Sequence, residues 1–303
     1  MKHLLKLSDW STEEIKETLD LADKLKAEKK AGIEHHILKG KTLGMIFEKS
    51  STRTRVSFEV GIHDLGGTGL FLSSRDLQLG RGEPIEDTAR VLSRYLDLIM
   101  IRTFEQEKVE KLAEYGSIPI INGLTDYCHP CQVLADLMTI REYKGKLEGL
   151  KLCYIGDGNN MTNSLIVGGI KMGMEVSVAC PKGYEPDAEI MKWASENGKF
   201  TCTDNILEAA KGADAVYTDV WASMGQESEA AQRRLVFEGK YQVNADVMSV
   251  ANPNAMVLHC LPAHRGEEIT ADVLEAHASE IFAEAENRLH AQKAVLVKCF
   301  ENA

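Results

Sequence analysis

The sequence lacks both a long apolar run and an excess of positive charge. None of its hydrophobic stretches approaches the roughly eighteen residues that a membrane-spanning helix requires. Lys and Arg number 35 against 46 Asp and Glu, so the formal net charge is −11. Because nucleic-acid binding draws on a large excess of basic side chains, this balance argues against a general polyanion-binding surface. We expect no membrane or nucleic-acid partner, and any anion site has to be local.

We also expect neither a disulfide framework nor a targeting segment. Its seven cysteines form an odd set without dense spacing, which favours free thiols in a reducing compartment. The N-terminal stretch MKHLLKLSDWSTEEIKETLDLADKLK predicts an amphipathic helix rather than an apolar signal core or an acid-poor transit segment. We therefore expect a cytoplasmic protein.

Two α/β domains are the expected architecture. With 303 residues, 44% of them hydrophobic, the chain exceeds the usual size of one simple domain, although one long domain stays possible. Strand-like runs alternate with helical segments, which is typical of βαβ units on parallel sheets flanked by helices. The expected strands are residues 42–47, 69–74, 97–103 and 117–123 in the first half, and 151–156, 175–180, 215–221 and 255–261 in the second.

Helical segments separate these strands and close the chain. Helical spacing occurs at residues 53–65, 86–96, 105–115, about 129–143 and 281–300. The turn-rich stretch KGKLEGL precedes the second set of strands, so we expect domains over residues 1–143 and 144–278. Residues 279–303 are expected to form a C-terminal helix that packs back on the first domain. In open parallel sheets, ligands lie beyond the carboxyl ends of the strands, so the loops there should carry the chemistry.

Residues 50–55, SSTRTR, follow the first expected strand and open a helix. Backbone N–H groups, the positive end of the helix dipole and Ser and Thr hydroxyls can converge on one anion there. Arg53 adds a planar guanidinium suited to phosphate oxygens, whereas Arg55 lies about 200° away on a helix and is assigned a structural role. The alternative is a helix cap followed by a solvated basic turn. The spacing is not that of a P-loop, so nucleoside triphosphates are disfavoured.

Two further strand ends in the first half carry polar side chains. Arg102 ends an apolar strand, where burying a charge costs desolvation free energy unless an anion pairs with it. The alternative is an edge residue whose guanidinium reaches solvent. HPCQ at 129–132 opens a helix with proline at the first position, where its missing N–H is harmless. Cys128 and Cys131 form a C-x-x-C, which also allows a thioredoxin-like or zinc interpretation, although no second ligand pair is near.

The second half has three strand ends of the same kind. GDG at 156–158 begins like a dinucleotide fingerprint, but Met161 stands where a glycine is required, so no nicotinamide cofactor is expected. DVWASMG at 219–225 offers a carboxylate and a hydroxyl that can recognise an ammonium group, or else forms an ordinary turn. HCLP at 259–262 places Cys260 at a strand end, where inert packing is the alternative. Arg288, taken alone, would be a surface charge.

Taken together, these segments resemble the aspartate and ornithine carbamoyltransferase family, and its ornithine branch most closely. The similar segments are FEKSSTRTRVSFE at 47–59, HPCQ, GDGNNMTNS at 156–164, DVWASMG and HCLP, and they occur in family order over nearly the whole chain. The resemblance implies transfer of the carbamoyl group of carbamoyl phosphate to the δ-amine of L-ornithine, giving L-citrulline and phosphate. It implies no cofactor and no metal. It also implies a homotrimer, or a multiple of trimers, with shared active sites.

The resemblance assigns a role to each matched residue. The residues implied for carbamoyl phosphate are Ser51, Thr52, Arg53, Thr54, Gln78 from a neighbouring subunit, Arg102, His129, Gln132, Cys260, Leu261 and Arg288. Those implied for ornithine are Asn160 at the α-carboxylate, Asp219 and Ser223 at the α-amino group, and Met224. Those implied to be catalytic are Arg53, Arg102, His129, Asp219 and Cys260.

A mechanism follows from these roles. Attack by a neutral amine builds negative charge on the carbamoyl oxygen, which donors from the SSTRTR loop, Arg102 and His129 would stabilise. The δ-ammonium has an ordinary pKa of about 10.4, so the site has to favour its deprotonated form. We hypothesise that Asp219 and Cys260 position this amine. The alternatives are a carbamoyltransferase for putrescine or an acylated ornithine, and a non-catalytic or redox module on the same scaffold.

Overall fold

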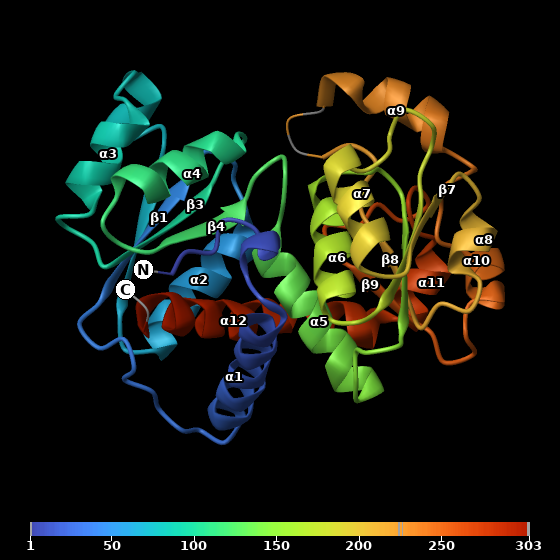
Figure 1. Cartoon of the computed structure of the whole chain (residues 1–303), viewed down its shortest axis with the longest axis horizontal. Coiled ribbons are helices and arrows are strands. Elements are labelled where there is room, and N and C mark those ends of the chain that lie inside the picture. The colour runs from blue at the N-terminus through green and yellow to red at the C-terminus, as the bar shows by residue number, and fades with distance from the viewer. Residues whose placement is uncertain (1, 224, 226, 302–303) are drawn as a thin grey trace. The chain divides into compact units, whose positions relative to one another are not determined.

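The computed structural model describes residues 2–223, 225 and 227–301. The chain divides into two compact units, one formed by the residues up to Ala135 together with those from Asn287 onward, the other by Asp136–Glu286. Each unit is a parallel sheet flanked by helices, as the sequence predicts (Figure 1). Among the described residues, no helix is both long and apolar enough to cross a bilayer.

The first unit has a four-stranded sheet in the order β2-β1-β3-β4. Its strands are β1 (Thr42–Phe47), β2 (Thr68–Ser73), β3 (Leu98–Arg102) and β4 (Ile120–Leu124). The chain passes from β1 to β2 on one side and then returns to place β3 on the other side of β1. The direction of winding therefore reverses between β1 and β3, and in such sheets ligands bind beside the loops that follow the strands at this point.

Helices connect the strands of the first unit. They are α1 (Thr12–Lys30), α2 (Thr52–Asp64), α3 (Ile85–Leu92) and α4 (Gln106–Tyr115), with short 3-10 turns η1 (Leu7–Asp9) and η2 (Gln78–Arg81). Helix α2 begins where the sequence predicts because the Ser51 hydroxyl accepts a hydrogen bond from the Thr54 N–H at 3.1 Å.

The last helix, α12 (Ala278–Glu301), brings its C-terminal part into the first unit. Lys26 Nζ on α1 donates to Asn287 Oδ1 at 2.8 Å, and Gln292 Nε2 donates to Ser57 Oγ on α2 at 2.7 Å. Both contacts join α12 to helices from the start of the chain (Figure 1). The expected return of the C-terminal helix is confirmed.

The second unit has a five-stranded sheet in the order β7-β6-β5-β8-β9. Its strands are β5 (Lys151–Ile155), β6 (Glu175–Ala179), β7 (Phe200–Thr203), β8 (Ala215–Thr218) and β9 (Met256–His259). The direction of winding reverses here between β5 and β8, so ligands are expected beside the loops that follow these two strands, as after β1 and β3 in the first sheet.

The helices of the second unit are α5 (Pro130–Lys144), α6 (Asn160–Lys171), α7 (Ala188–Asn197), α8 (Ile206–Ala210), the 3-10 turn η3 (Glu227–Glu229), α9 (Ala230–Phe237), α10 (Ala245–Val250) and α11 (Ala271–Ala276).

Two features of the second sheet differ from the sequence prediction. Strand β7 was not expected, because FTCT lies at the sheet edge with its side chains half-buried or exposed and so lacks an apolar run. The strand expected at 215–221 ends at Thr218. It stops there because the Asp219 carboxylate accepts a hydrogen bond from the Val220 N–H, which takes that donor out of the sheet. Asp219 consequently stands in the loop.

The division between the units falls inside two helices. Helices α5 and α12 each contribute residues to both units, with the changes at Ala135/Asp136 and Glu286/Asn287. The domain limits expected from the sequence, after residues 143 and 278, lie at the end of α5 and at the start of α12. As limits of independently folding domains they stay a prediction.

Candidate functional site

In the first unit, Arg288 on α12 joins residues that lie far apart in the sequence. Its Nη1 donates to Gln132 Oε1 at 2.6 Å, its Nη2 to Thr54 Oγ1 at 3.3 Å and its Nε to Gln292 Oε1 at 3.0 Å. The side chain is only 3% exposed, so it is not a surface charge. Three segments that the sequence singles out, around residues 54, 132 and 288, therefore meet in one place.

His129 lies within the electrostatic reach of three guanidinium groups. Its burial, and then the positive charges of Arg288, Arg102 and Arg53, hold the pKa of His129 well below its usual range. The imidazole is therefore neutral at physiological pH and can act as an N–H donor without carrying charge. The same three cations make the local field positive, which favours an anion. We call Arg53, Thr54, Arg102, His129, Gln132 and Arg288 the phosphate cluster.

The two arginines of SSTRTR have different surroundings, as expected for side chains about 200° apart on a helix. Arg55 is exposed, its Nε lies 3.4 Å from the Glu59 carboxylate, and its guanidinium carbon lies 3.8 Å from the centre of the Phe71 ring. Arg53 is half-buried and contributes to the field at His129. Arg55 is thus held in a structural stack, while Arg53 is directed to the phosphate cluster.

Arg102 ends an interior strand. Strand β3 pairs with β1 on one side and with β4 on the other, and the pairing with β4 shifts register between Ile101 and Arg102. Such irregularities redirect a side chain at the end of a strand. Arg102 is 7% exposed, so the alternative of a solvent-reaching edge residue is wrong.

The remaining residues expected at the phosphate lie near the start of α2 or apart from it. Ser51 caps α2, and Thr52 is its exposed first residue. Gln78 is exposed on η2, and the hydrogen bonds described for the phosphate cluster do not include it. The structure of one chain therefore does not bring Gln78 to the other predicted ligands.

The C-x-x-C pair beside this cluster has the properties of packing residues. Burial raises the pKa of Cys128 and of Cys131 to about 12. The Cys128 thiol donates to the Leu5 carbonyl at 3.5 Å and the Cys131 thiol to the Asn122 carbonyl at 3.4 Å. A reactive dithiol needs a lowered pKa, so the thioredoxin-like interpretation is not supported.

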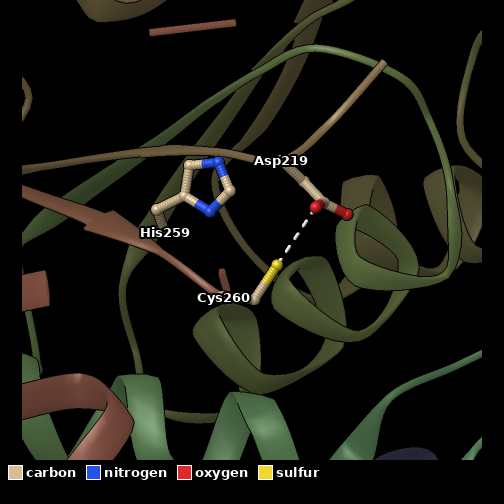
Figure 2. A group of neighbouring side chains, drawn as sticks. All are labelled: Asp219, His259 and Cys260. Carbon is tan, nitrogen blue, oxygen red and sulfur yellow. Dashed lines mark hydrogen bonds between the residues drawn. The ribbon is translucent and has the colours of Figure 1, made fainter. Parts of the chain in front are cut away.

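In the second unit, the Asp219 carboxylate is held by three donors. Its Oδ1 accepts from the Val220 N–H at 2.8 Å and from Cys260 Sγ at 3.1 Å, and its Oδ2 accepts from Asn159 Nδ2 at 2.9 Å. Figure 2 shows the Cys260 side chain directed at this carboxylate. Loops after β5, β8 and β9 thus supply one polar group, which we call the carboxylate cluster: Asn159, Asp219 and Cys260.

Cys260 is a hydrogen-bond donor in this cluster. Burial of the sulfur, followed by the negative charge of Asp219 and the hydrogen bond to it, raises the pKa of Cys260 well above its usual range. The group is therefore a thiol at neutral pH. It is neither a base nor an activated nucleophile.

His259 supports the backbone beside Cys260. Its Nδ1 accepts a hydrogen bond from the Leu261 N–H at 2.9 Å, which assigns the ring proton to Nε2. Nε2 then donates to Glu268 Oε1 at 2.9 Å, and both side chains are fully buried. Leu261 has φ of +57°, a left-handed conformation that costs a residue with a side chain about 1–2 kcal/mol. His259 and Glu268 hold this conformation, and no pattern in the sequence indicates their pairing.

Asp219, His259 and Cys260 also have metal-ligand chemistry, with their ligand atoms all within 4.8 Å of one another. Each of these atoms already has another partner. Asp219 accepts three hydrogen bonds, both nitrogens of His259 are engaged, and the Cys260 sulfur retains its proton. A metal ion would have to displace these contacts and the thiol proton, so the residues fit hydrogen bonding better than metal binding.

The loop after β5 owes its shape to two glycines. Gly156 has φ of +147°, which residues with side chains rarely adopt. A Cβ on Gly158 would lie 2.3 Å from backbone atoms of Glu185 and Pro186, so that only glycine fits. These two glycines are explained by the backbone conformation and close packing of the loop, without a bound dinucleotide. Asn159 then caps α6 by accepting from the Met161 and Thr162 N–H groups.

Asn159 belongs to the carboxylate cluster, although the sequence did not indicate it. The resemblance pointed to its neighbour Asn160, which is the half-buried first residue of α6. The Asn159 side chain donates to the Asp219 carboxylate at 2.9 Å. The available signal was the preference for asparagine at a helix cap, which explains Asn159 locally but does not predict its distant partner. Ser223 is half-buried in the loop after β8, and Met224 lies outside the described residues.

Arg233 on α9 connects the loops of the carboxylate cluster. Its Nη1 donates to Asp157 Oδ2 at 2.7 Å and to the Trp221 carbonyl at 3.1 Å, and its guanidinium lies 5.1 Å from the Tyr184 ring centre. Burial raises the pKa of Asp157 to about 6 in spite of the opposing charge of Arg233. The sequence AAQRRLVF contains nothing that singles out this arginine.

The role of Cys260 as a donor leads to a prediction about its replacement. Cys260→Ser keeps a donor to Asp219 and should retain turnover within about tenfold, whereas Cys260→Ala should lose about 10- to 100-fold, as expected for a hydrogen bond to a charged group. Because the thiol stays protonated, neither variant should remove an ionisation near pH 8–9 from the profile of kcat/KM against pH. If kcat/KM changed with an ionisation near pH 8–9 in the wild type but not in the two variants, Cys260 would not be a protonated donor.

Comparison with known proteins gives consistent results over the whole chain. The family model "Aspartate/ornithine carbamoyltransferase, carbamoyl-P binding domain" matches residues 2–142, and the model for the Asp/Orn binding domain matches residues 148–299. The ornithine carbamoyltransferase of Carboxydothermus hydrogenoformans is 59% identical over 300 residues, covering 97% of this chain and 96% of that protein. That of Anoxybacillus flavithermus is 60% identical over 301 residues, covering 98% and 96%.

Solved structures agree with these matches. The ornithine carbamoyltransferase from Pyrococcus furiosus has a TM-score of 0.95 and 52% identity, covering 100% of this chain and 98% of that one. The anabolic ornithine carbamoyltransferase from Campylobacter jejuni has a TM-score of 0.94 and 44% identity, with full coverage of both chains.

Proposed function

The chain belongs to the aspartate/ornithine carbamoyltransferase family, and from this premise we propose how its residues divide the reaction between them. It is an enzyme that transfers the carbamoyl group of carbamoyl phosphate to the δ-amine of L-ornithine, giving L-citrulline and phosphate. We assign carbamoyl phosphate to the phosphate cluster and ornithine to the carboxylate cluster. The observation that carries the assignment is the set of hydrogen bonds from Arg288 to Thr54 and Gln132.

The phosphate cluster can hold both ends of carbamoyl phosphate. Phosphate oxygens would accept from the N-terminal N–H groups and hydroxyls at residues 51–54 and from the guanidiniums of Arg53, Arg102 and Arg288. Because Thr54 Oγ1 accepts from Arg288, its own hydroxyl proton is directed elsewhere and can reach the carbamoyl oxygen. Neutral His129 donates a second hydrogen bond to that oxygen. Gln132 Oε1, which accepts from Arg288, would also accept from the carbamoyl amide.

The carboxylate cluster can orient ornithine. Asn160 would bind the α-carboxylate, while Asp219 and Ser223 would bind the α-amino group. Met224 and the backbone of Cys260 and Leu261 would complete the contacts. Support comes from the fixed orientation of Asp219, whose three donors leave its remaining lone pairs in a defined direction.

The reaction on these residues is a direct transfer. The neutral δ-amine attacks the carbamoyl carbon, the N–C bond forms, and charge builds on the oxygen that faces Thr54 and His129. The C–O bond to phosphate then breaks, and the excess amine proton passes to the departing phosphate. The protonated Cys260 thiol cannot take the proton from the δ-ammonium, so Cys260 and Asp219 orient the amine and that proton leaves to solvent before attack. Turnover therefore rises with pH as the neutral amine becomes more abundant.

Acceptor specificity tests the proposed function. Putrescine keeps an amine at the position of the α-amino group but lacks the α-carboxylate that Asn160 would bind, and N-acetylornithine has no free α-amine for Asp219 and Ser223. A site built to hydrogen-bond a polar group rejects analogues without it by about 10⁴–10⁵-fold, so kcat/KM for both should fall by about that factor relative to ornithine. Citrulline formation from purified substrates is the measurement. Equal use of N-acetylornithine would overturn the assignment of the α-amine to Asp219 and Ser223, and equal use of putrescine would overturn that of the α-carboxylate to Asn160.

We also propose that the protein works as a homotrimer, or a multiple of trimers, in which Gln78 reaches the active site of a neighbouring subunit. The family resemblance and the exposure of Gln78 on η2 support this arrangement. Sedimentation should give a mass of three 33.5 kDa chains or a multiple of it. Refolding Gln78→Ala together with Arg53→Ala should regain activity, because some hybrid sites then contain both native residues. Mixtures no more active than the separate variants would place both residues in one chain's site.

A further inference from the structure

Strands β6 and β7 bring two cysteine thiols together outside the carboxylate cluster. Cys202 on β7 is paired in register with Val178, and the Cys180 N–H donates to the Thr203 carbonyl at 3.1 Å. Because side chains alternate along a strand, Cys180 lies on the same face as Val178 and hence as Cys202. The two sulfur atoms are 3.7 Å apart. The residues are 22 positions apart in the sequence, and no spacing motif reveals the pair.

The two thiols differ in their access to solvent. Cys202 is exposed at the sheet edge, whereas Cys180 is 3% exposed beneath it. The hydrogen bond between the two sulfurs, in which either atom can be the donor, lowers the pKa of Cys202 and raises that of Cys180. Partial burial of Cys202 and then the charge of Glu185 act in the opposite direction on this pKa, but their effects are smaller. The exposed sulfur is therefore the nucleophile and the buried one stays protonated.

The other five cysteines lack this combination. Burial raises the pKa of Cys128, Cys131 and Cys153 to about 12, and raises those of Cys260 and Cys299 as well. Of the seven cysteines, all within the described residues, only Cys202 has a pKa below its ordinary value and an exposed side chain. Reagents that oxidise thiols should thus act first at Cys202.

We propose that Cys180 and Cys202 are a reversible oxidation site that forms a disulfide with small-molecule disulfides as the oxidant. The Cys202 thiolate attacks one sulfur of the reagent, the reagent's S–S bond breaks, and one thiolate leaves. Cys180 then loses its proton and attacks the Cys202 sulfur of the mixed disulfide, which expels the second thiolate. The two protein thiols are oxidised, the reagent is reduced to two thiols, and the protons end on these products.

The geometry needs little change for this step. The sulfurs have to approach from 3.7 Å to about 2.0 Å, which side-chain rotation on adjacent strands can supply. The disulfide would link edge strand β7, which has a single neighbour, to β6 and close the loop over residues 181–201. Closing a loop restricts the unfolded chain, so the oxidised protein should unfold at a higher urea concentration than the reduced protein. Neither sulfur touches the carboxylate cluster, so turnover should change less than about twofold, the size of a surface substitution effect.

The experiment treats the native enzyme with bis(2-hydroxyethyl) disulfide and counts thiols after unfolding. The wild type should lose two thiols, regain them with dithiothreitol, and yield a peptide that links Cys180 to Cys202. Cys202→Ser, an exposed change that should fold and turn over normally, should lose none over the same period. Cys299→Ser is the matched control and should lose the same two thiols as the wild type.

Three results would overturn the proposal. They are an unchanged thiol count in the wild type, a loss in Cys202→Ser equal to that of the wild type, and a mixed disulfide that persists at Cys202 while Cys180 stays open to alkylation. Cys180→Ser adds a positive test where it folds, because the mixed disulfide should accumulate there and not resolve.

Discussion

Arg53→Ala is expected to lower kcat/KM for carbamoyl phosphate about 10³-fold, the scale of losing a charged donor to a group on which charge develops in the transition state. The loss should appear in both kcat and KM, because we propose that Arg53 binds the phosphate in the ground state and stabilises the charge that builds on it as it leaves. Steady-state kinetics at saturating ornithine measures both. Arg53 is half-buried, so the variant should fold as the wild type does.

The matched control lies two residues away on the same helix. Arg55→Ala removes an equal charge from α2, but that guanidinium is exposed and engaged with Glu59 and Phe71. Its kcat/KM should change by less than about threefold, as for a surface substitution. Similar losses in the two variants would show that net charge near the helix N-terminus, rather than the direction of Arg53, governs phosphate binding. A loss confined to Arg55→Ala would reverse the assignment.

Asp219→Asn is expected to lower kcat/KM for ornithine about 10³-fold. The replacement has the same shape, but its amide can present only one acceptor oxygen, so its NH₂ has to face either the Asn159 amide or the Cys260 thiol, which are both donors. The side chain loses both its charge and its fixed orientation, and hydrogen bonds to charged groups contribute about 1.5–3 kcal/mol each. Affinity for inorganic phosphate, measured by titration calorimetry, should stay within about threefold.

Asp204→Asn is the control for Asp219→Asn. Its carboxylate is 56% exposed and its ion-pair partner Lys182 lies 3.7 Å away, so the change should alter kcat/KM by less than about twofold. A parallel loss of phosphate and ornithine affinity in Asp219→Asn would indicate general damage to the fold. Unchanged kcat/KM for ornithine would remove Asp219 from the amine site.

Much of the fold could be predicted because its cause is local. Strand β1 was expected at its observed limits, since its apolar run is bounded by a lysine and by a polar loop. Helix α2 begins after Ser51 because that hydroxyl caps it. Strand β7 was missed because its cause is not local: four polar and apolar residues are extended only because β6 offers a neighbour.

The predicted site residues also separate into those with a local signal in the sequence and those without one. The sequence indicated Arg53, Arg102 and Asp219 because charged side chains at the ends of apolar strands are unusual and follow a pattern known from one family. It gave no sign of Asn159 beside Asp219, of Arg233 beside Asp157 or of Glu268 beside His259. Each of these pairs joins segments whose separation in space depends on how the sheet is ordered.

Periodicity, capping and turn chemistry act over a few neighbouring residues, so local patterns were enough to predict most segments that become strands and helices and the polar residues at their ends. Which of these ends meet depends on the tertiary fold. In the first sheet, the order β2-β1-β3-β4 places the loops after β1 and β3 beside each other. In the second sheet, the order β7-β6-β5-β8-β9 does the same for the loops after β5 and β8. Strand order follows from the packing of distant apolar surfaces, which leaves no local pattern in the chain.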